Sequence, residues 1–137
     1  MFKTKYLSLL LATLLLTACN PKAEEPATEV PTNPLISVES PKAGETVSSP
    51  LVITGQARGY WYFEASFPVE LLDANGQRIA NNIATAQDEW MTEEFVPFKA
   101  ELTFDKPTTA TGSLVLHKDN PSGMPENEDS ITIPVKF

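Results

Sequence analysis

The stretch WYFEASFPVEL, residues 61–71, decides the fold class of this chain. Apolar side chains occupy its odd-numbered positions, and the even-numbered positions carry mostly polar side chains. A period of two places successive side chains on opposite faces of an extended strand. We therefore expect one half-buried strand over 61–71, with Trp61 and Phe63 in the core. Pro68 lacks an amide proton, so we expect it at a bulge or at a sheet edge.

The same two-residue period recurs on both sides of that stretch. Turn residues separate the runs, and Asn75-Gly76 favours the positive φ angles of a tight hairpin. About seven short strands in about 100 residues predict an all-β fold, an immunoglobulin-like antiparallel β-sandwich. The other alternating runs cover residues 36–38, 51–57, 79–86, 98–104, 112–116 and 131–137.

The N-terminus reads as a lipoprotein signal. Leu16-Thr17-Ala18-Cys19 forms a lipobox, and Cys19 is the only cysteine. Two lysines precede an apolar run of 11 residues at 6–16, whereas a membrane span needs about 20. We expect cleavage between Ala18 and Cys19, which removes residues 1–18 as a signal peptide. The alternative is an ordinary signal peptide with a free thiol at the cleavage site.

Lipidation of Cys19 predicts the location of the protein. A diacylglyceryl cysteine with an N-acyl group such as palmitate carries two or three chains, whereas one chain binds membranes only marginally. Asn20 follows the cysteine, where Asp commonly retains lipoproteins in the inner membrane of two-membrane bacteria. We expect the periplasmic leaflet of an outer membrane if the cell has one. Otherwise we expect the outer face of the cytoplasmic membrane.

A linker separates the anchor from the domain. Residues 19–34 contain the lipidated cysteine followed by a segment rich in proline and glutamate, which favours extended, solvated chain. At about 3.1 Å per residue, such a disordered linker reaches roughly 45 Å. Residues 35–137 then form the single folded domain.

Charge and cysteine content exclude several classes of protein. Without residues 1–18, the chain has eight basic and 18 acidic residues, a net charge of −10. Binding of nucleic acid needs lysine and arginine, so no nucleic-acid partner is expected. With Cys19 lipidated, no thiol remains for a disulfide or a cysteine metal site. No cofactor is expected.

Exposed aromatic residues are the candidate ligand contacts. If 61–71 is one strand, Tyr60 and Tyr62 lie outside the core beside Glu64, an arrangement suited to a sugar or a peptide. Trp90 and Met91, in an acidic segment between strands, form a second candidate contact patch. The alternative is that these rings only stabilise a sheet through cross-strand pairs.

Catalytic and metal sites are weakly indicated. His117 is the only histidine, and Ser113, Ser122 and Asp119 are loose neighbours without the context of an activated nucleophile. No catalytic residue is therefore expected. The segment 119–129 is rich in the oxygen ligands that calcium prefers but lacks the spacing of an EF-hand. Calcium binding there remains an alternative, although no metal site is expected.

The motifs SP…G…V…SPL…GQA at 40–57, WYFEASF at 61–67 and KDNPSG at 118–123 carry a family resemblance. They resemble the immunoglobulin-like domain of bacterial spore germination proteins, over essentially residues 36–137. The resemblance implies an extracytoplasmic β-sandwich accessory domain, often in lipoproteins, without an established activity.

Together these observations predict a lipid-anchored, non-catalytic accessory module that mediates protein–protein interaction or assembly in the bacterial cell envelope. Its expected partners are the membrane, through the anchor, and an envelope protein or peptidoglycan. One alternative is a glycan- or peptidoglycan-binding module. Another is a small hydrolase or metal-handling protein.

Overall fold

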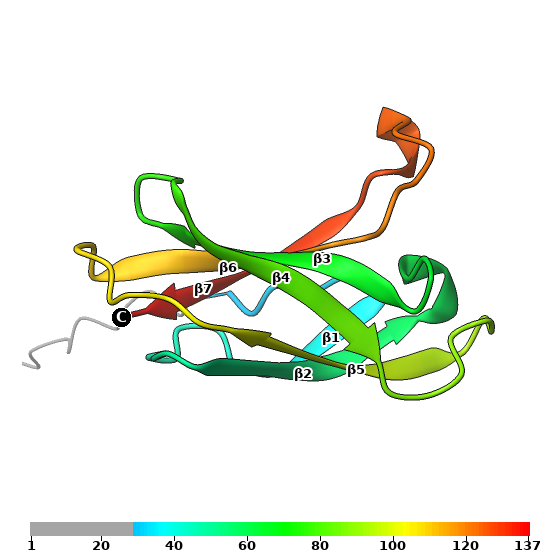
Figure 1. Cartoon of the computed structure of the whole chain (residues 1–137), viewed down its shortest axis with the longest axis horizontal. Coiled ribbons are helices and arrows are strands. Elements are labelled where there is room, and N and C mark those ends of the chain that lie inside the picture. Colours follow the sequence, from blue (N-terminus) through cyan, green and yellow to red (C-terminus); the bar gives the residue numbers. More distant parts are fainter. Residues whose placement is uncertain (1–28) are drawn as a thin grey trace, which may run out of the picture.

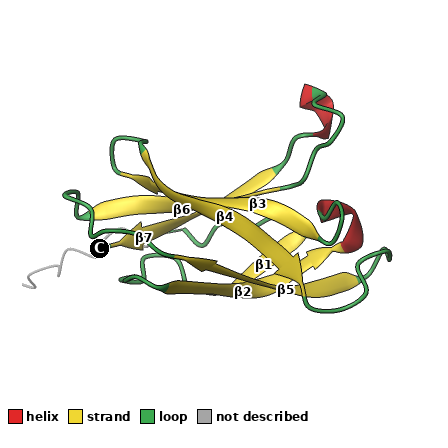
Figure 2. Cartoon of the chain, in the orientation of Figure 1, coloured by secondary structure: helices red, strands yellow, loops and turns green. Residues whose placement is uncertain are grey.

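A computed structural model describes residues 29–137. The predicted signal peptide, Cys19 and most of the linker lie outside the described residues. The described part contains seven strands, which confirms the all-β class, and two single-turn 3₁₀ helices at Gly59–Trp61 and Pro125–Asn127 (Figure 2). None of its helices has the length and apolar character needed to cross a membrane. The strands are β1 (Ile36–Ser40), β2 (Leu51–Arg58), β3 (Ser66–Asp73), β4 (Arg78–Ala86), β5 (Phe95–Leu102), β6 (Thr111–His117) and β7 (Ser130–Lys136).

The strands form one antiparallel sheet that folds over into two layers. Their hydrogen-bonded order is β1-β2-β5-β4-β3-β6-β7. One layer contains β1, β2 and β5, and the other contains β3, β4, β6 and β7 (Figure 1). The layers are joined where the end of β4 meets β5, with Thr85 opposite Lys99 and Ala86 opposite Phe98. This arrangement is the predicted immunoglobulin-like sandwich.

Alternating side chains of both layers fill the core. Every second residue of β2 from Leu51 to Ala57 is buried, and β5 and β7 show the same alternation. Within residues 29–137, the only buried side chains that carry a polar atom are those of Trp61 and Tyr62. At one end of the core, Phe67 packs edge-to-face with Tyr62 and Phe98, with ring centroids 5.2 and 5.0 Å apart. Such aromatic pairs contribute about 0.5–1.5 kcal/mol each beyond their buried area.

The prediction of one strand over 61–71 is wrong in its first half. The chain makes a 3₁₀ turn and then a tight turn, in which Glu64 and Ala65 have φ angles of 48° and 64°. These two left-handed residues reset the alternation, because an extended backbone is needed to maintain it. As a result Tyr62 is buried, with 4 % of its surface exposed, and Phe63 is exposed at 43 %. The alternation predicts the reverse, with Tyr62 outside the core and Phe63 inside it.

Pro68 lies in β3 without a bulge. It is opposite Ile83 of β4, and pairing of β3 with β6 begins only at the next residue, Val69. The register shift lies instead between Leu71 and Leu72. The predicted bulge at Pro68 is therefore wrong, but this proline does stand where β3 has a partner strand on one side only.

The first described residues run from a groove near the end of β1 to the loop after β6. Val30 and Pro31 share a surface groove with residues 41–43, next to the end of β1. The Asn33 side chain then donates a hydrogen bond to Asp129 Oδ1 (3.1 Å), and the chain turns back there into β1. In Figure 1 the described chain accordingly begins toward the end that holds the C-terminus.

Candidate functional site

Three loops meet at one end of the sandwich, on the right of Figure 1. We call this surface, formed by residues 59–65, 87–94 and 118–129, the loop end. The Gly59 amide donates to the Glu94 carbonyl (3.1 Å), and the Asp119 amide donates to the Trp61 carbonyl (2.9 Å). Backbone hydrogen bonds therefore hold segments far apart in sequence together as one surface.

Gly59 permits the closest approach between two of these loops. A Cβ atom at this position would collide with the carbonyl oxygens of Trp90 and Thr92. A glycine is required here because only it lets the two backbones pass at this distance.

Exposed apolar side chains are concentrated at the loop end. Eight large hydrophobic residues are exposed within residues 29–137, and five of them lie in these loops or at the adjoining start of β5. Of these five, the sequence predicts Tyr60 and Met91 as exposed contacts. The five are Tyr60, Phe63, Met91, Phe95 and Met124.

Part of this surface is concave. A cavity of about 330 Å³ opens between the turn after β2 and the loop after β6. We call it the aromatic pocket. Its lining residues are Tyr60, Tyr62, Phe63, Lys118, Asp119, Asn120, Pro121, Ser122 and Asn127.

The four predicted contact residues besides Met91 all lie at the loop end but differ in exposure, and two of them, Tyr60 and Tyr62, line the pocket. Tyr60 is 49 % exposed, and Glu64 is exposed in the adjacent turn. The Tyr62 side chain is buried and its hydroxyl donates to the Val96 carbonyl at 2.6 Å. Burial raises the pKa of this phenol. Trp90 is half-buried and packs against the core. The outward orientation predicted for Tyr62 is therefore wrong, because its hydroxyl finds a partner in the interior.

The polar side chains of the loop after β6 bond to one another. Asn120 Nδ2 donates to the Met124 carbonyl (2.9 Å), and the Ser122 hydroxyl donates to Asn120 Oδ1 (2.6 Å). Asn127 Nδ2 donates to the Ser122 hydroxyl oxygen (3.0 Å), and Lys118 Nζ donates to the Asn127 carbonyl (3.2 Å). These hydrogen bonds connect the wall of the pocket and engage Asn120, Ser122 and the Asn127 side-chain amide nitrogen.

Negative charge is also concentrated at the loop end. Its three loops carry nine acidic residues and one lysine, whereas the loops 41–50 and 103–110 at the opposite end carry two acidic and two basic residues. Partial burial raises the pKa of the Asp119 carboxyl, the neighbouring Glu64 carboxylate raises it further, and a hydrogen bond from the Asn120 backbone opposes both.

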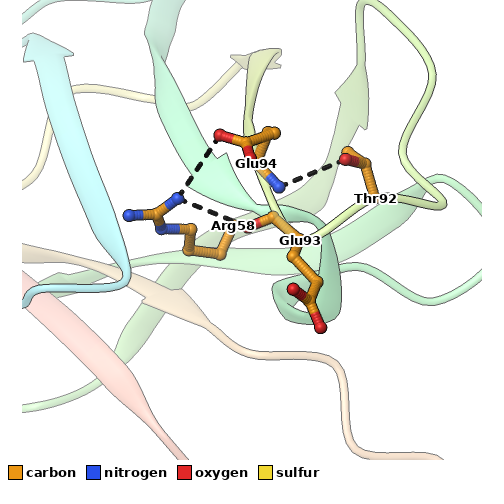
Figure 3. Close-up of polar contacts among 4 residues, drawn as sticks. All are labelled: Arg58, Thr92, Glu93 and Glu94. Carbon is orange, nitrogen blue, oxygen red and sulfur yellow. Dashed lines mark hydrogen bonds and ion pairs between the residues drawn. The ribbon is translucent and has the colours of Figure 1, made fainter.

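Arg58, which adjoins the loop end, already has partners of its own. Arg58 Nη1, at the end of β2, lies 3.8 Å from Glu94 Oε2 and 3.4 Å from the Glu93 carbonyl oxygen (Figure 3). Its guanidinium group lies 4.0 Å from the ring centroid of Phe95. The Glu94 amide is held in turn by the Thr92 hydroxyl (3.2 Å). Arg58 thus orders the end of the loop 87–94.

His117 lies outside the pocket, on the outer face of β6. Its Nε2 is 3.0 Å from Glu70 Oε1, and Arg78 Nη1 is 3.7 Å from Glu70 Oε2. Neither Ser113 nor Ser122 hydrogen-bonds to it. Over the described residues, no group of three or more His, Cys, Asp or Glu side chains is placed to hold a metal ion, including in the loop 119–129.

Residues 35–135 match the family model described as the immunoglobulin-like domain of bacterial spore germination. The chain belongs to this family. The match covers all seven strands of this germination-type domain except the last residue of β7. Comparisons with curated proteins and with solved structures gave no match. Membership indicates a non-catalytic accessory module.

Proposed function

We propose that this germination-type domain is a lipid-anchored, extracytoplasmic accessory module that binds an envelope protein through the loop end. The concentration of five of the eight exposed large hydrophobic side chains at this end carries the proposal. Clustered apolar exposure commonly marks an interaction surface, and aromatic residues and methionine are enriched in protein interfaces.

The proposed anchor is compatible with this use of the loop end. The described chain begins toward the opposite end of the sandwich, and its first residues hydrogen-bond to the loop end only where Asn33 donates to Asp129. A lipid on Cys19 therefore leaves the loop end free to point away from the bilayer. The negative charge of the loop end also favours an orientation away from the bilayer, since anionic lipid headgroups repel it.

The internal hydrogen bonds of the pocket favour a protein partner over a glycan. Recognition of a sugar needs several polar groups free to bond its hydroxyls. Asn120, Ser122 and Asn127 are already engaged with one another or with the backbone. The pocket adds aromatic surface and the carboxylate of Asp119.

Photo-crosslinking in the producing cell tests the proposed function. A photoreactive amino acid replaces Phe63 at the loop end, and a matched variant carries it at Ile83, which is 53 % exposed on β4. We expect a discrete crosslinked product in the membrane fraction from position 63 and none from position 83. Identical products from both positions, or no product, contradict the proposal.

A pelleting assay with purified peptidoglycan tests the glycan alternative. We expect the domain to stay in the supernatant. Sedimentation that is lost on Tyr60→Ala would instead identify the loop end as a glycan-binding surface.

A further inference from the structure

We propose that the aromatic pocket binds a lysine or arginine side chain from a basic segment of the partner protein. The inference rests on the proposed function and names the chemistry of the partner. It is carried by the aromatic surface and by two carboxylates, Asp119 and Glu64, that form no ion pair within residues 29–137.

The aromatic surface provides one side of the site. Tyr60 and Phe63 are 49 % and 43 % exposed and both line the pocket. The face of an aromatic ring attracts a cation, and the attraction is strongest where water is partly excluded. The concave shape between the two loops provides such partial exclusion.

The carboxylates provide the other side. Asp119 lines the pocket, Glu64 lies close to it, and within residues 29–137 neither forms an ion pair. Partial burial and mutual repulsion both disfavour the charged form of Asp119, as its raised pKa indicates. A guest cation relieves the repulsion and satisfies the carboxylate oxygens with charge-assisted hydrogen bonds.

Cations of the chain itself do not fill this role. Arg58 is held by Glu94 and by the ring of Phe95. Lys118 lines the pocket, but its ammonium group donates to the Asn127 carbonyl (3.2 Å) and forms no ion pair with Asp119 or Glu64.

The negative charge around the pocket also favours a basic ligand. Nine acidic residues and one lysine in the three loops attract a basic segment over long range and repel an acidic one. Apolar side chains next to the basic residue of the guest would contact Met124 and the exposed rings.

Fluorescence anisotropy with the detergent-solubilised, lipidated protein tests the inference. The probe is a labelled peptide of eight residues that alternates lysine and leucine, and its counterpart alternates glutamate and leucine. We expect saturable binding of the lysine peptide at physiological ionic strength, weakened by added salt, and no binding of the glutamate peptide.

Matched variants separate the pocket from the overall charge. Asp119→Asn and Tyr60→Ala are each expected to weaken binding about tenfold, the effect of losing one charge-assisted or cation–π contact. Asp105→Asn removes the same charge from the opposite end, and Ile83→Ala removes an exposed apolar side chain from β4. Both controls are expected to bind like the unaltered protein. If a pocket variant unfolds, the exposed Glu64→Gln replaces it.

Two results would overturn the inference. One is the absence of binding by the lysine peptide, and the other is an equal loss of affinity for Asp119→Asn and Asp105→Asn.

A competition experiment separates failure of this inference from failure of the proposed function. If position 63 still crosslinks to a protein in the presence of excess lysine peptide, the docking surface stands and the basic guest is wrong. If position 63 gives no crosslink at all, the proposed function itself fails.

Discussion

Asp119 is half-buried, lies near a second carboxylate and has no basic partner within residues 29–137. Its pKa is raised above the ordinary value, chiefly by burial and further by Glu64. The folded state therefore holds the proton more tightly than the unfolded state does. The stability that this group contributes is greatest below its ordinary pKa and is lost as the pH rises through the raised folded value.

Asp119→Asn is expected to raise the unfolding temperature at pH 7, because asparagine cannot become charged and its oxygen can still accept the backbone hydrogen bond. The difference from the unaltered protein should shrink toward pH 3, where the aspartate is protonated. Thermal unfolding followed by circular dichroism between pH 3 and pH 7 measures this. A lower unfolding temperature at pH 7 would contradict the assignment of Asp119 as an uncompensated carboxylate.

Tyr62→Phe is expected to lower the free energy of unfolding by about 1–2 kcal/mol. The substitution removes the hydroxyl that donates to the buried Val96 carbonyl and leaves that oxygen without its donor. Urea denaturation provides the measurement. Tyr60→Phe removes an exposed hydroxyl and should change stability by less than about 0.5 kcal/mol. Equal effects of the two substitutions would show that the Tyr62 hydroxyl bond contributes nothing.

At the scale of elements, the loop end depends on how β2, β5 and β6 end. The turn after β2 contacts the loop 87–94 through Gly59 and the loop 118–129 through Trp61. The geometry of the aromatic pocket is therefore coupled to the packing of one loop on another. A change in this packing should alter both stability and binding at the pocket.

Gly59→Ala is expected to destabilise the domain by about 1–3 kcal/mol, a cost typical of overpacking. The added methyl group collides with the backbone of the loop 87–94, which cannot rotate away as a side chain can. The control is Gly123→Asn, because Gly123 has open space around it and asparagine tolerates its φ of 66°. Urea unfolding compares the two variants. A larger loss for the control would contradict the close-approach argument.

Much of the element pattern could be predicted from the sequence, because strand alternation and turn residues are local signals. The alternating runs at 51–57 and 131–135 have the buried faces that were expected. The turn at 73–76 also forms, and Asp73 Oδ1 accepts from the Asn75 and Gln77 amides. The prediction was wrong at 62–65, because two consecutive non-glycine residues with positive φ leave no clear mark in the sequence.

At the scale of the whole molecule, charge and exposed apolar surface are concentrated at the same end. The described part of the chain begins toward the other end of the sandwich, where the C-terminus also lies. In the proposed arrangement, the lipid holds one end near the membrane and the linker leaves the loop end free to meet a partner.

Cys19→Ala is expected to abolish lipidation and release the protein from membranes, since the remaining chain has no other acyl attachment site of this kind. Membrane fractionation with immunodetection measures the release. In a two-membrane host, the control Asn20→Asp should remain lipidated but move to the inner membrane. Quantitative retention of the alanine variant in membranes would contradict the predicted anchor.

The amino-acid sequence alone determined the all-β class, the strand count and most of the buried faces, since these follow from a period of two and from local turn preferences. It also carried the family motifs, which are local. Only the tertiary structure decided that residues 59–65, 87–94 and 118–129 form one surface, because pairings between distant strands bring them together. The tertiary structure likewise decided that Tyr62 lies inside and Phe63 outside, since backbone φ angles and a buried carbonyl set their directions.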